Sequence, residues 1–175
     1  IHRDIKPGNV MLRTAGGSED HARIAITDFG LARETGTGSM TESGAIVGTP
    51  IYMPPEQVLD FKSVTPAGDL YSTAATLYYL ISGQFIYDEI EGGDVIRMLL
   101  EDPPVPIQKR RPEVPTGLAK VLERGLARDP DQRYQSAGEL RAELLALLEG
   151  YRYQPSELAE LMGRLFRQEV EREEE

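Results

Sequence analysis

Four polar side chains in the first 28 residues have the types needed for magnesium-assisted phosphate chemistry. The segment His-Arg-Asp-Ile-Lys-Pro-Gly-Asn, at positions 2–9, supplies a carboxylate at Asp4, an ammonium at Lys6 and an amide at Asn9. A second carboxylate, Asp28, follows in the segment Thr-Asp-Phe-Gly. A carboxylate can accept a hydroxyl proton and an ammonium can neutralise phosphate charge. Mg²⁺ prefers hard oxygen ligands and keeps several waters, so two protein ligands suffice for it.

Two short strands joined by a turn are the elements that must position these side chains. Residues 10–12 and 23–27 predict the strands, and the polar, turn-rich segment 14–20 between them predicts a hairpin. An antiparallel hairpin brings the end of its second strand back to the start of its first. We therefore expect Asp28 to lie near Asn9, so that both residues can face one magnesium–nucleotide group.

A long loop and then a helical body are predicted after the hairpin. Residues 31–50 carry glycines and hydroxyls without any helical or strand period, and a loop of that length is usually functional or disordered. Residues 67–82 are apolar nearly all round, which is typical of a helix buried inside a domain. Pro66 fits the first position of this helix and Gly83 fits its end.

Further helices are predicted from periodicity and from residues that begin or end helices. We expect helices near 94–100 and 116–127, with a Pro-rich connection between them. Ser136 and Glu139 form a capping box ahead of a helix with apolar positions up to 148. An amphipathic helix is predicted from about Pro155, and the acidic residues 169–175 follow it. The expected fold class is mainly α, with a small β-hairpin at a cleft.

Composition excludes several classes of function. The 175 residues are 40% hydrophobic, which is enough to bury one core and suits one domain or a large part of one. The net charge of −10 argues against nucleic acid as a partner. The sequence has no cysteine, so it can form neither a disulfide nor a thiolate metal site. The longest apolar stretch, residues 70–81, is too short and too polar to span a bilayer, and no signal-peptide pattern is present.

Several short signatures occur in the order and at the intervals of one enzyme family. They are His2-Arg3-Asp4 with Asn9, Asp28-Phe29-Gly30, Gly48-Thr49-Pro50, Pro54-Pro55-Glu56, Asp69 and Arg133. With these residues the chain resembles the large lobe of a eukaryotic-like Ser/Thr protein kinase of bacterial type, beginning at the catalytic loop. The resemblance implies a kinase large lobe at residues 1–149 and a separate amphipathic helix with an acidic tail at residues 150–175.

The resemblance implies a catalytic or cofactor-binding role for five residues. Asp4 would accept or orient the proton of the Ser or Thr hydroxyl on a protein substrate. Lys6 would sit against the transferred phosphate of ATP, and Asn9 and Asp28 would hold Mg²⁺. Thr49 would correspond to the loop threonine that hydrogen-bonds to the catalytic Asp and Lys in Ser/Thr-specific members.

Other residues are expected to serve structure. The resemblance implies that His2 and Phe29 act by packing, as parts of a stacked hydrophobic spine. Glu56 and Arg133 would form a buried ion pair, and Asp69 would be the buried aspartate that opens the central helix.

Regulation is expected to involve the long loop. An arginine before the catalytic aspartate, here Arg3, pairs in this family with a phosphate on that loop, which orders it. We expect Thr41 to be the first choice for phosphorylation and Ser43 the second, although Ser and Thr are also common in any flexible loop.

The sequence departs from a complete kinase in lacking a Gly-rich phosphate loop, a strand lysine and a helix glutamate. The resemblance therefore implies that the ATP-gripping small lobe, or N-lobe, is a missing partner, and that the chain alone is inactive. A cytoplasmic location is expected, either free or as the cytoplasmic domain of a membrane-anchored kinase. Two alternatives stay open: a pseudokinase-like interaction module, and a small-molecule phosphotransferase of the antibiotic-kinase type. The second alternative lacks the docking segment found here at 48–56.

Overall fold

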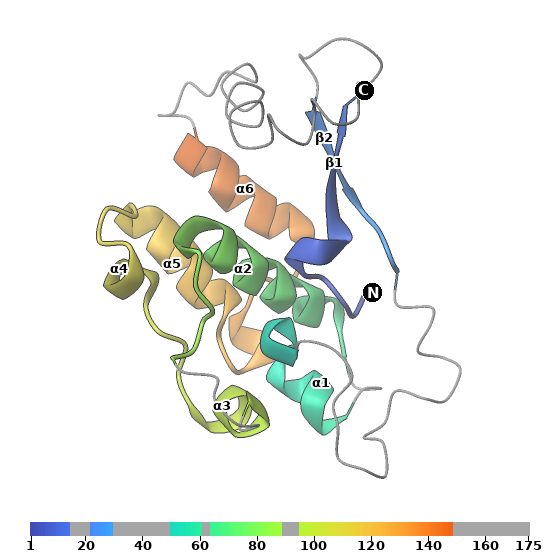
Figure 1. Ribbon diagram of the computed structural model, residues 1–175, viewed down its shortest axis with the longest axis vertical. Coiled ribbons are helices and arrows are strands. Elements are labelled where there is room, and N and C mark those ends of the chain that lie inside the picture. Colours follow the sequence, from blue (N-terminus) through green and yellow to red (C-terminus); the bar gives the residue numbers. More distant parts are fainter. Residues whose placement is uncertain (15–21, 30–49, 61–63, 89–94, 149–175) are drawn as a thin grey trace, which may run out of the picture.

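The computed structural model describes residues 1–14, 22–29, 50–60, 64–88 and 95–148 (Figure 1). One two-stranded sheet stands against a body of helices, and Figure 1 shows the hairpin rising from one side of that body. Short 3₁₀ helices occur at Pro7–Asn9, Pro50–Tyr52 and Pro130–Gln132. The predicted fold class, mainly α with one small hairpin, is confirmed.

The hairpin forms where the sequence predicts it. Strands β1 (Val10–Thr14) and β2 (Ala22–Ile26) are antiparallel, and Val10 lies opposite Ile26. The pairing continues one step past the ladder, where the Thr27 N–H donates to the Asn9 carbonyl at 2.9 Å. The start of β1 and the residues that follow β2 are therefore held side by side.

Helix α2 (Pro66–Ser82) is the central element of the body. Pro66 begins it, at a position where a missing N–H leaves no intrahelical bond unmade. Gly83 ends it in the left-handed conformation, with φ of 70° and its N–H bonded to the Tyr79 carbonyl at 2.8 Å. Most residues of α2 are buried, as an all-round apolar helix requires.

Helices α3 (Val95–Glu101), α5 (Thr116–Gly125) and α6 (Ala137–Leu148) also agree with the sequence, although α5 ends two residues early. The Ser136 hydroxyl accepts the Glu139 N–H at 3.1 Å, so one half of the predicted capping box is present. In the other half, the Glu139 carboxylate accepts the N–H of Gln135 instead of that of Ser136. The cap of α6 is thus extended by one residue.

Two short helices were not predicted, namely α1 (Pro55–Leu59) and α4 (Ile107–Arg110). Segments of four or five residues cannot display a period of 3.6 residues, so the sequence carries no signal for them. The loop predicted at 31–50, apart from Pro50, and the helix predicted from Pro155 lie outside the described residues.

The main core gathers buried side chains of α2, α3 and α5, and α2 packs against α5. Fully buried side chains from these helices include Tyr71, Tyr78, Leu99 and Leu122. A cavity of about 550 Å³ lies between α5 and the connection at 102–107, and none of the described residues before Pro55 lines it. In the described part of the chain, no helix combines the length and the apolar character needed to cross a membrane.

Candidate active site

Asp4, Lys6 and Asn9 form one hydrogen-bonded group. The Lys6 ammonium lies 2.9 Å from Asp4 Oδ2. The Asn9 amide nitrogen donates to the Asp4 carbonyl at 2.8 Å and to Asp4 Oδ2 at 3.2 Å. The 3₁₀ helix at Pro7–Asn9 creates this arrangement, because it turns the chain so that Asn9 reaches back to Asp4. Asn9 is buried, whereas the Asp4 and Lys6 side chains are each 32% exposed and remain accessible.

Asp28 follows β2 at the end that lies beside Asn9. Both backbone polar groups of the preceding residue, Thr27, are bonded: its N–H donates to the Asn9 carbonyl, and its carbonyl accepts from His2 Nε2 at 2.9 Å. Asp28 itself is exposed and has φ of 55°, a left-handed conformation that Asp adopts more readily than most residues. The structure therefore brings the backbone of Asp28 next to Asn9, as the hairpin prediction requires.

The oxygen atoms of this group suit Mg²⁺. The Asn9 amide nitrogen is directed to the Asp4 carbonyl, which leaves the amide oxygen as the atom for a cation, and Asp28 adds an exposed carboxylate. Within the described residues there is no group of three or more His, Cys, Asp or Glu side chains that could hold a metal. An ion held by Asn9 and Asp28 would complete its shell with water and phosphate oxygens, which is the usual arrangement for Mg²⁺.

Asp69 lies in the first turn of α2, where it is partly exposed and not buried as expected, and its carboxylate fixes the backbone of the loop at residues 2–9. Its Oδ2 accepts the His2 N–H at 2.7 Å, and its Oδ1 accepts the Arg3 N–H at 2.8 Å. A carboxylate is favoured at this end of a helix because the unpaired N–H groups there carry partial positive charge. Arg3 has φ of 68°, so the two bonds hold the chain in a conformation that a residue with a Cβ seldom adopts.

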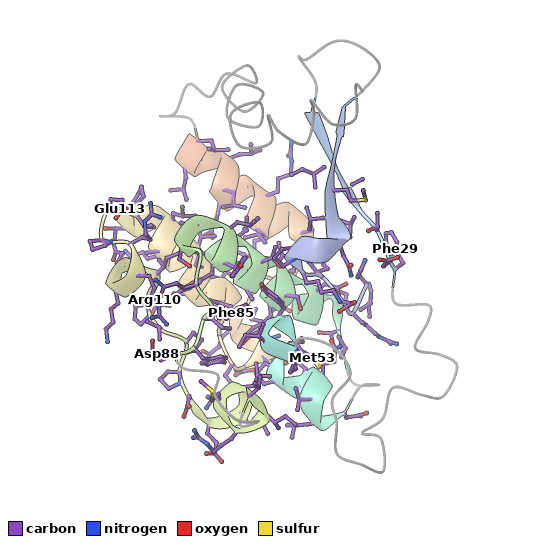
Figure 2. The ribbon with its side chains drawn as sticks, viewed as in Figure 1. Phe29, Met53, Phe85, Asp88, Arg110 and Glu113 are labelled. Atoms are coloured by element: carbon purple, nitrogen blue, oxygen red, sulfur yellow. The ribbon has the colours of Figure 1, made fainter. Side chains whose placement is uncertain are left out.

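His2 and Phe29 lie in contact, with ring centroids 4.8 Å apart. The His2 ring also bridges the backbone, since Nδ1 accepts the Asp4 N–H at 3.2 Å while Nε2 donates to the Thr27 carbonyl. His2 is buried, but Phe29 is 61% exposed and lies at the outer edge of the structure, beyond the end of β2 (Figure 2). His2 thus connects the loop that carries Asp4 to the segment that carries Asp28.

Glu56 and Arg133 form the ion pair that the sequence suggests. Arg133 Nη1 and Nη2 lie 2.7 and 2.8 Å from the two carboxylate oxygens of Glu56. The remaining guanidinium protons go to the carbonyls of Ala127, Arg128 and Ala67. The Arg133 side chain is fully buried above the ring of Tyr71, whose pKa is raised, first by burial and then by Tyr87. The pair therefore attaches α1 to the body of the lobe.

Three residues proposed from the sequence, Thr41, Ser43 and Thr49, lie outside the described residues. Sequence reasoning also missed one polar contact near the site: the Gln57 side chain donates to the Arg3 carbonyl at 2.9 Å. The partner is a backbone atom 54 residues away, so no residue spacing could have indicated it.

Comparison with known sequences identifies the family. The protein kinase domain family matches residues 1–144, and the chain therefore belongs to that family. The chain is 39% identical over 145 residues to the serine/threonine-protein kinase PknK of Mycobacterium tuberculosis, covering 82% of this chain and 12% of that protein. It is 37% identical over 155 residues to the serine/threonine-protein kinase PknB of Mycolicibacterium smegmatis, covering 86% and 23%.

A third relative is the serine/threonine-protein kinase PknA of Mycobacterium tuberculosis, with 31% identity over 152 residues, 87% of this chain and 33% of that protein. All three relatives are bacterial, which confirms the resemblance to bacterial kinases. The chain spans between 12% and 33% of the length of these curated relatives.

Proposed function

We propose that the chain is the catalytic large lobe of a protein Ser/Thr kinase, which transfers phosphate from Mg–ATP to a Ser or Thr hydroxyl of a protein. The observation that carries the proposal is that the hydrogen-bonded residues Asp4, Lys6 and Asn9 lie beside the strand end that leads into Asp28. Lys6 and Asn9 each donate a hydrogen bond to Asp4, and the Asn9 carbonyl accepts the N–H of Thr27, the residue before Asp28. These are the residue types, in one place, that phosphoryl transfer requires.

Each residue has a task that its contacts support. Asp4 accepts or orients the proton of the substrate hydroxyl, and Asn9 and Lys6 fix the direction of its carboxylate. Lys6, partly exposed, can also neutralise charge on the transferred phosphate. Asn9 and Asp28 hold the metal. When bound, Mg–ATP supplies the phosphoryl group and the positive charge that offsets its oxygens.

A small lobe is proposed to pack against the hairpin side of this chain. Large apolar side chains are exposed there, on and beside the hairpin, namely Ile1, Met11, Ile24, Ile26 and Phe29. In the strand register, Ile24 and Ile26 lie on one face of the hairpin, and Met11, opposite Ala25, lies on the other. Large apolar side chains exposed together in one region favour an interaction site. Because the sequence has no Gly-rich phosphate loop, we expect this chain alone to bind ATP weakly and to transfer little phosphate. The proposed boundary of the large lobe is residue 149, with residues 150–175 outside it.

Regulation by phosphorylation is proposed for the loop before Thr49. Arg3 would pair with a phosphate on Thr41 or Ser43, and Thr49 would contact Asp4 and Lys6. ATP is an intracellular substrate, so the proposed reaction takes place in the cytoplasm.

The test is a phosphorylation assay with the full-length protein that contains this chain. Radiolabelled ATP, a generic protein substrate and phosphoamino-acid analysis report the product. Asp4→Asn and Asp28→Asn should each lower kcat by about 100-fold or more, whereas Asp131→Asn, at an exposed aspartate within the 3₁₀ helix Pro130–Gln132, should leave it unchanged. Phosphoserine or phosphothreonine is the expected product. No transfer by the unaltered full-length protein would favour the pseudokinase-like alternative.

A further inference from the structure

Gln57 joins helix α1 to the catalytic loop. It is the third residue of α1, its side chain is buried, and its amide nitrogen donates to the carbonyl oxygen of Arg3 at 2.9 Å. Arg3 immediately precedes Asp4, so this carbonyl belongs to the peptide group that links the two residues. The Gln57 side chain thus binds the peptide group that precedes the proposed catalytic residue, Asp4.

That peptide group is held at both of its polar ends. Gln57 binds its oxygen, and the ring nitrogen Nδ1 of His2 accepts its N–H, the one that belongs to Asp4, at 3.2 Å. Asp69 holds the preceding N–H, that of Arg3, at 2.8 Å. Rotation of the Arg3–Asp4 peptide would break the first two bonds together, and such a rotation would redirect the Asp4 carboxylate.

The conformation at Arg3 explains why three side chains are needed. With φ of 68°, Arg3 is in the left-handed region, which is unfavourable for a residue with a Cβ. Backbone conformations of this kind persist only where the surroundings impose them. Asp69 holds the Arg3 N–H from α2, and His2 holds the Asp4 N–H from within the loop. Gln57 adds the contact from α1.

Helix α1 is itself fixed, so it can serve as a rigid support. Glu56, the residue beside Gln57, makes the two-pronged ion pair with buried Arg133. The Gln57 N–H is bonded to the Pro54 carbonyl at 3.0 Å. The two neighbouring side chains point to different partners, Glu56 to the body of the lobe and Gln57 to the catalytic loop.

We propose that Gln57 is a positioning residue for Asp4, which it orients by donating a hydrogen bond to the Arg3 carbonyl. The role of Asp4 that this inference uses rests on the proposed kinase function. Gln57 is buried and its side chain is bonded to the loop backbone, so its effect should fall on kcat and leave the KM for ATP unchanged.

The test replaces Gln57 in the full-length protein with Leu and with Glu. Leucine has similar size and no donor, so Gln57→Leu should lower kcat by about 10- to 100-fold at every pH. Ionised glutamate also cannot donate, but its protonated form can, and burial favours protonation. The kcat of Gln57→Glu should therefore rise toward the unaltered value as the pH falls from 8 to 6. Circular dichroism at each pH corrects kcat for the folded fraction.

The control is Gln84→Glu, because Gln84 is an exposed glutamine just past the end of α2. It should leave kcat unchanged across the same pH range relative to the unaltered protein. A Gln57→Leu variant with kcat within twofold of the unaltered protein would overturn the proposal. So would a Gln57→Glu deficit that does not change with pH.

A second measurement does not depend on activity. Amide hydrogen exchange at Arg3 and Asp4 should be at least tenfold faster in Gln57→Leu than in the unaltered protein, because the loop loses one support. Unchanged exchange at both amides would overturn the positioning role. Absence of phosphate transfer by the unaltered protein would instead count against the kinase function, and the exchange measurement would still decide whether Gln57 holds the loop.

Discussion

Arg133 and Glu56 lie 77 residues apart in the sequence and meet in a two-pronged ion pair with N–O distances of 2.7 and 2.8 Å. The arginine is fully buried and the Glu56 side chain is 18% exposed. All five guanidinium protons of Arg133 have acceptors, two on Glu56 and three on backbone carbonyls. The pair joins the start of α1 to the segment between α5 and α6.

Removing one partner of this pair should destabilise the protein strongly. Glu56→Gln leaves the buried guanidinium without its counter-charge, and loss of one partner of a buried pair costs about 3–5 kcal/mol. Urea unfolding followed by circular dichroism measures the change. Arg111→Met is the control, because Arg111 pairs with Glu113 at an exposed site and such pairs contribute about 0–1 kcal/mol. Equal losses in both variants would contradict the account.

Asp69→Asn should loosen the loop at residues 2–9 without unfolding the helical body. The amide keeps the size of the side chain but has one accepting oxygen, so His2 or Arg3 loses its partner, at a cost of about 1–3 kcal/mol. Amide hydrogen exchange should become faster at His2 and Arg3, while amides in the middle of α2 keep their protection. Uniform acceleration throughout the protein would show that Asp69 acts on global stability instead.

Two glycine-to-alanine changes should differ in their effect on stability, because only one of them creates a clash. Gly125 ends α5, and a Cβ there would lie 2.6 Å from the Cβ of Ala74 on α2, too close for either backbone to tolerate. Overpacking typically costs about 1–3 kcal/mol, which exceeds the gain of about 0.5–1 kcal/mol from alanine in a helix. In Gly138→Ala the nearest atom is at 3.7 Å, so only the gain remains. Thermal unfolding should give a lower Tm for Gly125→Ala and an equal or higher Tm for Gly138→Ala.

Because of the Glu139 carboxylate, the free energy of unfolding of the lobe should depend on pH in the acidic range. Its hydrogen bond from the Gln135 N–H, and secondly its bond from Arg124, lower its pKa below the usual 4.5. A lowered pKa in the folded state means that the contribution is complete above the unfolded pKa and is lost as the pH falls through the folded value. Glu139→Gln should therefore lower the urea midpoint at pH 7 and make less difference at pH 3. A difference that is the same at both pH values would contradict this assignment.

Local signals were sufficient for the larger elements of the fold. Helix α2 was predictable because Pro66 and Gly83 mark its ends and apolar residues fill the interval. The hairpin was predictable because a polar turn separates two apolar runs. Helices α1 and α4 were not, because their formation depends on packing against α2 and α3 and their sequences are too short to show a period.

For the candidate site, the sequence could predict only the proximity that follows from chain topology. Asn9 and Asp28 could be predicted to lie close together because they flank the open end of one hairpin. The contacts that hold the loop could not, since Asp69 and Gln57 bind backbone N–H and carbonyl groups, which every residue has. When a side chain binds the main chain, the partner can be any residue type, so the sequence does not indicate which residue it is.

The left-handed backbone at Arg3 and Asp28 restricts which replacements these positions can accept. Side chains branched at Cβ, such as valine or isoleucine, clash in this region, whereas glycine and asparagine enter it readily. Each position thus has two requirements, a left-handed backbone and a charged side chain, and replacing the residue at random would test them separately. Glycine and asparagine would keep the backbone conformation and remove the charge. Residues branched at Cβ would disturb the backbone conformation as well.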